Sequence, residues 1–234
     1  MNVLSRIEQG LIVSCQALED EPLHGPILMA GMAWAAFQGG ASGLRINGVH
    51  DIEVAKRITG LPIIGIIKRR LQSGEIIITP TPDDAKAVIA AGADIVAVDA
   101  TQAKERPIPS AELISKIKEE VGCVIMADVG SLEDGVAAAR AGADIVASTF
   151  GGARGAFEDR GMDWELLDSL IQKTGKPVIA EGGIWTPLEA RKALDLGAHA
   201  VVVGSAITRP HVITRRFVKH MKATKSSVAC RNTE

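Results

Sequence analysis

The stretches 90-AAGADIVAVDAT-101, 140-RAGADIVASTF-150 and 195-DLGAHAVVVGSA-206 repeat one pattern: a helix end, a Gly-Ala turn and an apolar strand. Comparable apolar runs recur along all 234 residues. They are nearly continuous rather than alternating, which is typical of parallel strands covered on both faces. We therefore predict eight strands, at 11–16, 43–47, 62–68, 94–100, 123–129, 144–150, 177–183 and 200–206.

Helical patterns separate most of these strands, at 27–38, 83–91, 132–141 and 187–196. Several begin with Pro or acidic residues and end at Gly, as helices do. Eight such units without a linker-like stretch predict an α/β fold: a single (β/α)8 TIM barrel that takes residues 1–234 as one domain. The alternative, a doubly wound open sheet, usually has a Gly-rich loop after its first strand, where this chain has Ser14-Cys15-Gln16.

Both ends of the chain are expected to lie outside the barrel proper. The segment before Gly10 has the pattern of a short helix that caps the bottom of the barrel, and about 223–234 is expected to be a flexible tail. Seven basic residues lie from Arg209 onward. We interpret them as a solvated last helix, because a nucleic-acid surface would need denser charge and interleaved aromatic rings.

Composition narrows the class of protein further. The formal net charge is −2, aromatic residues make up 3% and Tyr is absent, which disfavours a nucleic-acid partner. No apolar run approaches the roughly 20 residues of a membrane span, and the N-terminus lacks the apolar core of a signal peptide. Three widely spaced cysteines fit neither a disulfide framework nor a zinc site. We expect a cytoplasmic protein with no membrane partner.

Reacting groups in such barrels lie at the carboxyl ends of the strands. Unpaired buried charges are too costly to gather there by chance. The predicted strand ends carry Gln16, Arg45, Asn47, Lys68, Asp99, Asp128, Thr149, Glu181, Gly182, Gly183, Gly204 and Ser205.

Two glycine turns suggest a phosphate site. Gly182-Gly183 follows the seventh strand and Gly204-Ser205 follows the eighth, so their N–H groups and a short helix near Ile207 can face one anion. The plainer alternative is that these glycines only make tight turns. Arg209 is a further candidate donor, or it forms a structural salt bridge.

Lys68 and Glu181 are the candidate catalytic pair. Lys68 ends an apolar strand, a setting that lowers the pKa of an amine and suits either a base or a Schiff-base nucleophile. Glu181 ends the seventh strand, and an amine opposite a carboxylate can move protons next to a carbonyl. Alternatively, Glu181 only orients Lys68 or Arg45. No pair of histidines has metal-ligand spacing, so we expect neither a metal nor a cofactor.

Several segments together resemble the N-acetylmannosamine-6-phosphate 2-epimerase family. The match runs in order from about Leu11 to the last helix. It is carried by SCQAL (14–18), LRINGV (44–49), IGIIKR (64–69), ITPT (78–81), MAD (126–128), IAEGGI (179–184) and HAVVVGSAITRP (199–210).

The resemblance implies a (β/α)8 barrel that interconverts N-acetylmannosamine 6-phosphate and N-acetylglucosamine 6-phosphate in sialic acid and N-acetylmannosamine breakdown. It places the catalytic roles on Lys68 and Glu181. Its remaining assignments are sugar contacts at Gln16, Arg45, Asp128 and Arg209, phosphate turns at Gly182-Gly183 and Gly204-Ser205, and a homodimer involving Phe217 and Met221 of the last helix.

The sequence departs from the family pattern at two places. Many members have Arg where this chain has Gly183, and many read Ser-Gly-Tyr-Thr where it has Phe150-Gly151-Gly152-Ala153. The Gly-rich segment 151–161 is a candidate mobile lid, and Trp185 is a candidate for the pocket rim.

The chemistry implied is proton transfer at C2 of an open-chain sugar, whose C1 aldehyde makes the C2 hydrogen acidic. Glu181 would assist ring opening and hold the acetamido group, while neutral Lys68 removes the C2 proton. Two alternatives stay open at this point: a Schiff-base lyase or aldolase using the same lysine, and a phosphosugar-binding module without catalysis.

Overall fold

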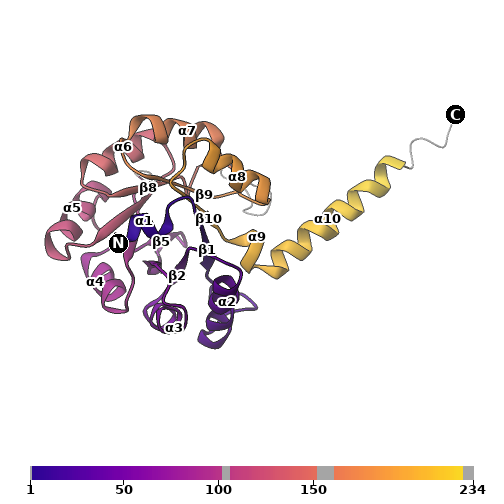
Figure 1. The fold of residues 1–234 in the computed structure, drawn as a ribbon, viewed down its shortest axis with the longest axis horizontal. Coiled ribbons are helices and arrows are strands. Elements are labelled where there is room, and N and C mark those ends of the chain that lie inside the picture. The colour runs from indigo at the N-terminus through magenta and orange to yellow at the C-terminus, as the bar shows by residue number, and fades with distance from the viewer. Residues whose placement is uncertain (1, 102–105, 152–160, 229–234) are drawn as a thin grey trace.

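Eight parallel strands close into a barrel in the computed structural model, which describes residues 2–101, 106–151 and 161–228, with side chains through Lys222 (Figure 1). The order around the barrel is β1-β10-β9-β8-β7-β6-β3-β2. These strands are β1 Leu11–Cys15, β2 Gly43–Asn47, β3 Ile63–Ile66, β6 Ile95–Asp99, β7 Val124–Asp128, β8 Ile145–Ala147, β9 Val178–Glu181 and β10 Ala200–Val203. All eight predicted strands are confirmed, and with them the TIM barrel.

Helices alternate with the strands and form the outer ring (Figure 1). They are α2 Pro26–Gln38, α3 Val49–Thr59, α4 Pro82–Ala90, α5 Ser110–Glu120, α6 Leu132–Arg140, α7 Trp164–Lys173 and α8 Pro187–Asp195. Side chains of Thr81, Ser131, Asp163 and Thr186 each accept a backbone N–H of the helix that follows. These caps satisfy donors that a helix start leaves unpaired, and so fix where four of the helices begin.

Successive residues of each strand face opposite sides, which divides the core in two. In β6, Ile95 and Ala97 point into the barrel interior, whereas Val96 and Val98 pack under the outer helices. Apolar side chains fill most positions on both faces, which explains the hydrophobic runs of the sequence, and Arg45, Asp99 and Asp128 are buried charged exceptions on the strands.

The expected N-terminal capping helix is α1, Val3–Ile7. Ile7 is buried in the interior cluster, and Val3 and Leu4 pack against the same cluster. A contact between the Leu4 carbonyl and the His199 ring (3.0 Å) joins α1 to the last barrel strand. The helix therefore closes the barrel at the end opposite the carboxyl ends of the strands.

One element differs from the sequence prediction. Lys68 was expected to end the third strand, but β3 ends at Ile66 and Lys68 begins an antiparallel hairpin of β4 Lys68–Arg70 and β5 Ile76–Ile78. The chain turns away at Ile67, whose N–H and C=O are bonded by Thr79 at the base of the hairpin. Because those groups are taken, the apolar run cannot continue as a barrel strand.

Two helices follow the last barrel strand, one on the barrel and one that leaves it. The short helix α9 is Ser205–Thr208, and α10, Pro210–Val228, packs against α9 and projects away from the barrel (Figure 1). Residues 223–228 of the expected tail are thus helical, and 229–234 lie outside the described residues. Of the helices described, none combines the length and apolar character needed to cross a membrane.

Candidate active site

A pocket of about 400 Å³ opens at the carboxyl ends of the barrel strands. It is lined by Ser14, Gln16, Leu18, Glu21, Arg45, Lys68, Ile76, Ile78, Thr149, Phe150, Glu181, Gly182, Gly183, Ile184, Trp185, Val202, Gly204, Ser205, Thr208 and Arg209. Every residue given a catalytic, sugar-binding or phosphate-binding role in the sequence analysis is in this group except Asp128. Of the other strand-end residues, Thr149 lines the pocket, and Asn47 and Asp99 do not. The topology therefore brings together side chains that lie up to 195 positions apart, from Ser14 to Arg209.

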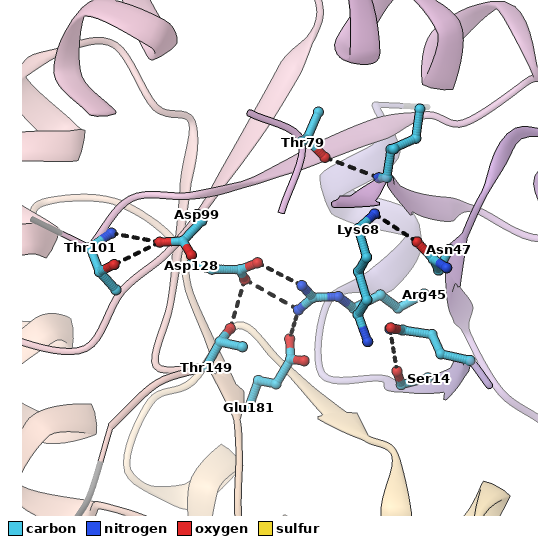
Figure 2. Close-up of polar contacts among 12 residues, drawn as sticks. Ser14, Arg45, Asn47, Lys68, Thr79, Asp99, Thr101, Asp128, Thr149 and Glu181 are labelled. Atoms are coloured by element: carbon cyan, nitrogen blue, oxygen red, sulfur yellow. Dashed lines mark hydrogen bonds and ion pairs between the residues drawn. The ribbon is translucent and has the colours of Figure 1, made fainter. Parts of the chain in front are cut away.

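Arg45 is the centre of a buried charge network at the pocket floor (Figure 2). Its Nη2 donates to Asp128 Oδ2 (2.6 Å) and its Nη1 to Asp128 Oδ1 (3.2 Å) and to Glu181 Oε2. Thr149 Oγ1 also donates to Asp128 (2.6 Å). Burial lowers the pKa of Arg45, but the two carboxylates outweigh it and hold that pKa above its ordinary value.

Asp128 therefore lies behind Arg45 and not at the pocket surface. Its two oxygens are engaged by Arg45 and Thr149, so its position suits orientation of these two pocket residues. Burial raises the pKa of Asp128 while Arg45 opposes the shift. A direct contact between Asp128 and a sugar stays a prediction.

Lys68 reaches the pocket from the hairpin, alongside Arg45 (Figure 2). Its backbone N–H donates to Asn47 Oδ1 (2.9 Å), which ties the start of the hairpin to the end of β2. Burial, with a smaller contribution from the positive Arg45, lowers the pKa of Lys68 to about 8. A substantial fraction of the amine is therefore neutral near physiological pH, as a proton-abstracting base requires.

Glu181 faces Lys68 from the end of β9. Its backbone is fixed by Ser148, whose Oγ donates to the Glu181 carbonyl (3.1 Å) and accepts from the Glu181 N–H (3.2 Å). Burial raises the pKa of Glu181 to about 7, with Arg45 opposing and Asp128 adding to the shift. The pKa values of Glu181 and Lys68 lie about one unit apart, so moving a proton between such groups costs only about 1.4 kcal/mol.

The two glycine turns lie side by side at the ends of β9 and β10. Gly182 (φ +98°) and Gly183 (φ +76°) both have left-handed backbone conformations that favour glycine. A Cβ at Gly183 would overlap the Gly161–Met162 peptide, so the arginine of many family members has no room here. Turns after strands seven and eight, followed by a short extra helix such as α9, are the usual phosphate site of a TIM barrel.

Arg209 and Glu21 form an ion pair at the pocket mouth. Glu21 also accepts from the Leu18 N–H (3.3 Å) within the loop after β1. Nε of Arg209 is buried and has no hydrogen-bond partner among the described residues, which leaves a donor for a ligand. Burial lowers the pKa of Arg209.

Sequence reasoning missed several lining residues, among them Ser14, Glu21, Ile76 and Ile78. Glu21 lies in an irregular loop without a motif, and the isoleucines lie on the hairpin that the strand pattern concealed. Trp185 was expected at the rim and does line the pocket, where Arg216 of α10 stacks on its ring (3.8 Å). Most of the candidate lid, 152–160, lies outside the described residues.

Within the described ranges, no group of three or more His, Cys, Asp or Glu side chains is arranged to hold a metal ion. The fold and pocket define a (β/α)8-barrel protein in which glycine turns after strands seven and eight line the same pocket as a buried lysine and a buried carboxylate.

Comparisons with known proteins identify the family within this class. The family described as "Putative N-acetylmannosamine-6-phosphate epimerase" matches residues 29–223. The chain is 49% identical to a protein of Caldanaerobacter subterraneus subsp. tengcongensis over 97% of both chains. It is 44% identical to one of Clostridioides difficile, over 93% of this chain and 98% of that one. Both relatives are named "Putative N-acetylmannosamine-6-phosphate 2-epimerase".

A solved structure agrees. The N-acetylmannosamine-6-phosphate 2-epimerase from Clostridium perfringens is 44% identical and superposes with a TM-score of 0.86, covering 94% of this chain and 96% of that chain. A thiamine phosphate pyrophosphorylase from Pyrococcus furiosus, 20% identical with a TM-score of 0.58, shares the fold alone. The chain belongs to the N-acetylmannosamine-6-phosphate epimerase family.

Proposed function

We propose that this protein inverts C2 of N-acetylmannosamine 6-phosphate to give N-acetylglucosamine 6-phosphate, in the breakdown of sialic acid and N-acetylmannosamine. The observation that carries the proposal is the pair of Lys68 and Glu181 in one pocket, with pKa values of about 8 and about 7. Near neutral pH a minority of the molecules hold Lys68 as a neutral amine and Glu181 as a protonated carboxyl at the same time, and this form supplies both a base and an acid.

The sugar would bind with its phosphate at Gly182-Gly183 and Gly204-Ser205, assisted by Arg209. Gln16 and Arg45 also line the pocket, and we expect them to contact the sugar hydroxyls. Glu181 would donate the proton that helps open the ring, which exposes the C1 aldehyde and acidifies the C2 hydrogen.

Neutral Lys68 then removes the C2 proton, and the electron pair passes into the C1 carbonyl to give an enolate. Donors on the pocket floor would stabilise the developing negative charge. Return of a proton to the opposite face of C2 inverts that carbon. The reaction involves no net gain or loss of atoms, because the proton removed from C2 is replaced by one proton from an enzyme group or from water.

Proton NMR of N-acetylmannosamine 6-phosphate with the purified protein in D2O tests the proposal. We expect the C2 proton signal to disappear as the gluco epimer grows. Epimer that retains its C2 proton also supports the activity, and it indicates a shielded base that returns the same proton. If neither exchange nor epimer forms, the proposed activity is wrong.

A Schiff-base lyase or aldolase would also use a lysine of lowered pKa. Borohydride distinguishes the two chemistries, because it reduces an imine between Lys68 and a sugar to a stable amine. We expect no substrate-dependent mass increase after reduction. A trapped adduct on Lys68 would favour the lyase.

We further propose a homodimer formed through α10. This helix extends away from its own barrel and exposes Phe217 (67%) and Met221 (70%), one turn apart on one face. An apolar groove of about 260 Å³ between β1, α2 and α9 includes Leu11 and Met32 in its lining. The helix α2 has no charged residue in its sequence 26-PILMAGMAWAAFQ-38, and Trp34 and Phe37 are partly exposed on it. A helix that is apolar all round is normally covered.

We also propose a cytoplasmic location. A phosphorylated sugar carries negative charge that does not pass the hydrocarbon core of a bilayer. The enzyme that consumes such a sugar is therefore expected in the compartment where the sugar is made. Fractionation of cells that express the protein would test this placement.

A further inference from the structure

The hairpin that carries Lys68 also carries two apolar residues of the pocket. Lys68 of β4 is paired directly with Ile78 of β5 in the antiparallel register. Directly opposed residues of such a pair point to the same face, with Cβ atoms about 5 Å apart. Ile76 lies two positions along β5 and so shares that face. All three side chains line the pocket.

The substrate of the proposed reaction has a matching arrangement of groups. C2 carries both the proton that Lys68 removes and the acetamido nitrogen. The path from C2 through the amide to the methyl has the dimensions of a trans peptide, which puts the methyl carbon about 3.8 Å from C2. A methyl so close to the reacting carbon must lie near whatever surrounds Lys68.

The two isoleucines differ in depth. Ile78 is 5% exposed and belongs to the cluster that fills the barrel interior, so it cannot move aside easily. Ile76 is only partly buried and lies nearer the hairpin tip. The polar phosphate turns and the Arg209–Glu21 pair come from other loops, those after β1, β9 and β10. The apolar residues beside Lys68 and the proposed phosphate site therefore come from different connections of the barrel.

From this arrangement we infer that Ile78 and Ile76 contact the methyl of the substrate's N-acetyl group and limit the length of the acyl chain. The inference rests on the proposed function and deepens it, because it assigns the specificity for the acyl group to the hairpin. Shortening either side chain should admit a longer acyl group, with the larger effect at the deeper Ile78.

The test compares kcat/KM for N-acetyl- and N-butanoyl-mannosamine 6-phosphate in wild type, Ile78→Ala and Ile76→Ala. The ratio of the two values in one preparation does not depend on the fraction of active enzyme. We expect the butanoyl-to-acetyl ratio to rise about tenfold or more in Ile78→Ala, and less in Ile76→Ala, as is usual for one or two methylenes in an apolar pocket. Ile78→Val, which removes one methyl from the interior cluster, should give a smaller rise in the same direction.

Leu18→Ala is the matched control, because Leu18 is an apolar lining residue from the loop that carries Glu21. Its ratio should equal that of wild type. An unchanged ratio in both Ile78 variants and Ile76→Ala, or an equal rise in Leu18→Ala, would overturn the inference while leaving the epimerase activity in place.

Failure of the proposed function has a different signature. Wild type would then convert neither sugar, and the acyl preference would be measured as the ratio of Kd values for the same two sugars by calorimetry. A shift of that ratio in Ile78→Ala supports contact with the acyl group, and an unchanged ratio overturns it.

Discussion

Arg45 and Glu181 form an ion pair across the barrel mouth, from the middle residue of β2 to the last residue of β9. Arg45 is held from its other side by Asp128, so Glu181 is positioned by a cation that is itself immobile. Burial nonetheless raises the pKa of Glu181 to about 7. The pair therefore fixes where the carboxyl group lies while leaving it able to exchange a proton near neutral pH.

Replacing the candidate base should separate binding from chemistry. Lys68→Met is expected to abolish C2 deuterium exchange and epimer formation, while N-acetylglucosamine 6-phosphate still binds through the phosphate turns. NMR for exchange and calorimetry for binding check the two parts. A near wild-type rate in Lys68→Met would show that another group removes the proton.

The same substitution should stabilise the folded protein at neutral pH. Lys68 has a pKa of about 8 when folded and an ordinary value near 10.5 when unfolded, so its charged form is disfavoured in the fold. The penalty, on the order of 3 kcal/mol, is fully present below pH 8 and is lost as the pH rises toward 10.5. Thermal unfolding of Lys68→Met should therefore give a higher Tm than wild type at pH 7, with the difference shrinking at pH 10. A lower Tm at pH 7 would contradict this account.

The pH profile of kcat/KM should be bell-shaped with a maximum near pH 7.5. Toward pH 6 the rate falls because Lys68 becomes protonated, and toward pH 9 it falls because Glu181 loses the proton used in ring opening. The Glu181→Gln variant should be slower. Its pH profile should keep the fall in kcat/KM on the acidic side and lose the fall on the alkaline side. A wild-type profile that is flat from pH 6 to pH 9 would exclude both assignments.

Removing Arg45 should cost far more stability than removing a surface arginine. Arg45→Met leaves Asp128 and Glu181 buried without their cation, and breaking buried pairs typically costs about 3–5 kcal/mol. Arg191→Met is the control, since its pair with Asp195 on α8 is exposed to solvent and should contribute little to stability. Denaturant unfolding measures the loss of unfolding free energy in both variants. Similar losses would mean that the Arg45 network stabilises the fold no more than an exposed ion pair does.

Gly183 should tolerate no side chain. Gly183→Ala combines a strained positive φ with overlap on the Gly161–Met162 peptide, so the turn must shift and the KM for the phosphosugar should rise. Gly175→Ala is the control, because Gly175 also has a positive φ (+65°) but open space around its Cα. It should lose about 1 kcal/mol of stability with an unchanged KM. Equal KM values in the two variants would show that Gly183 is not part of the phosphate-binding site.

Charge on the apolar face of α10 should dissociate the proposed dimer. Phe217→Glu is expected to convert a dimer to a monomer in light scattering, whereas Lys222→Glu, also exposed on α10, should leave the dimer intact. A wild-type protein that is monomeric at micromolar concentration would show that α10 does not join two copies.

The barrel could be predicted from the sequence because burial on both faces leaves unbroken apolar runs, as in 94–100 and 200–206. Most residues of the pocket could be predicted because a barrel gathers its strand ends at one face, which placed Gln16 and Glu181 together. Lys68 also lines the pocket, because it lies only two residues beyond the end of β3. The β4–β5 hairpin could not be predicted from the sequence. An apolar run that leaves the barrel at Ile67 has the same residue pattern as one that continues as a barrel strand. The place of Glu21 in the pocket could not be predicted either. Its ion pair with Arg209 joins two irregular segments and depends on tertiary structure alone.

The β4–β5 hairpin belongs to the connection after the third barrel strand, outside the closed ring of interstrand bonds. Changes at its exposed positions, unlike changes at the core residue Ile78, therefore leave the barrel intact, and such changes can shift the amine and the adjoining isoleucines together. Natural variation in this one connection, or its exchange between relatives, offers an evolutionary route to new amino-sugar preferences on an unaltered scaffold.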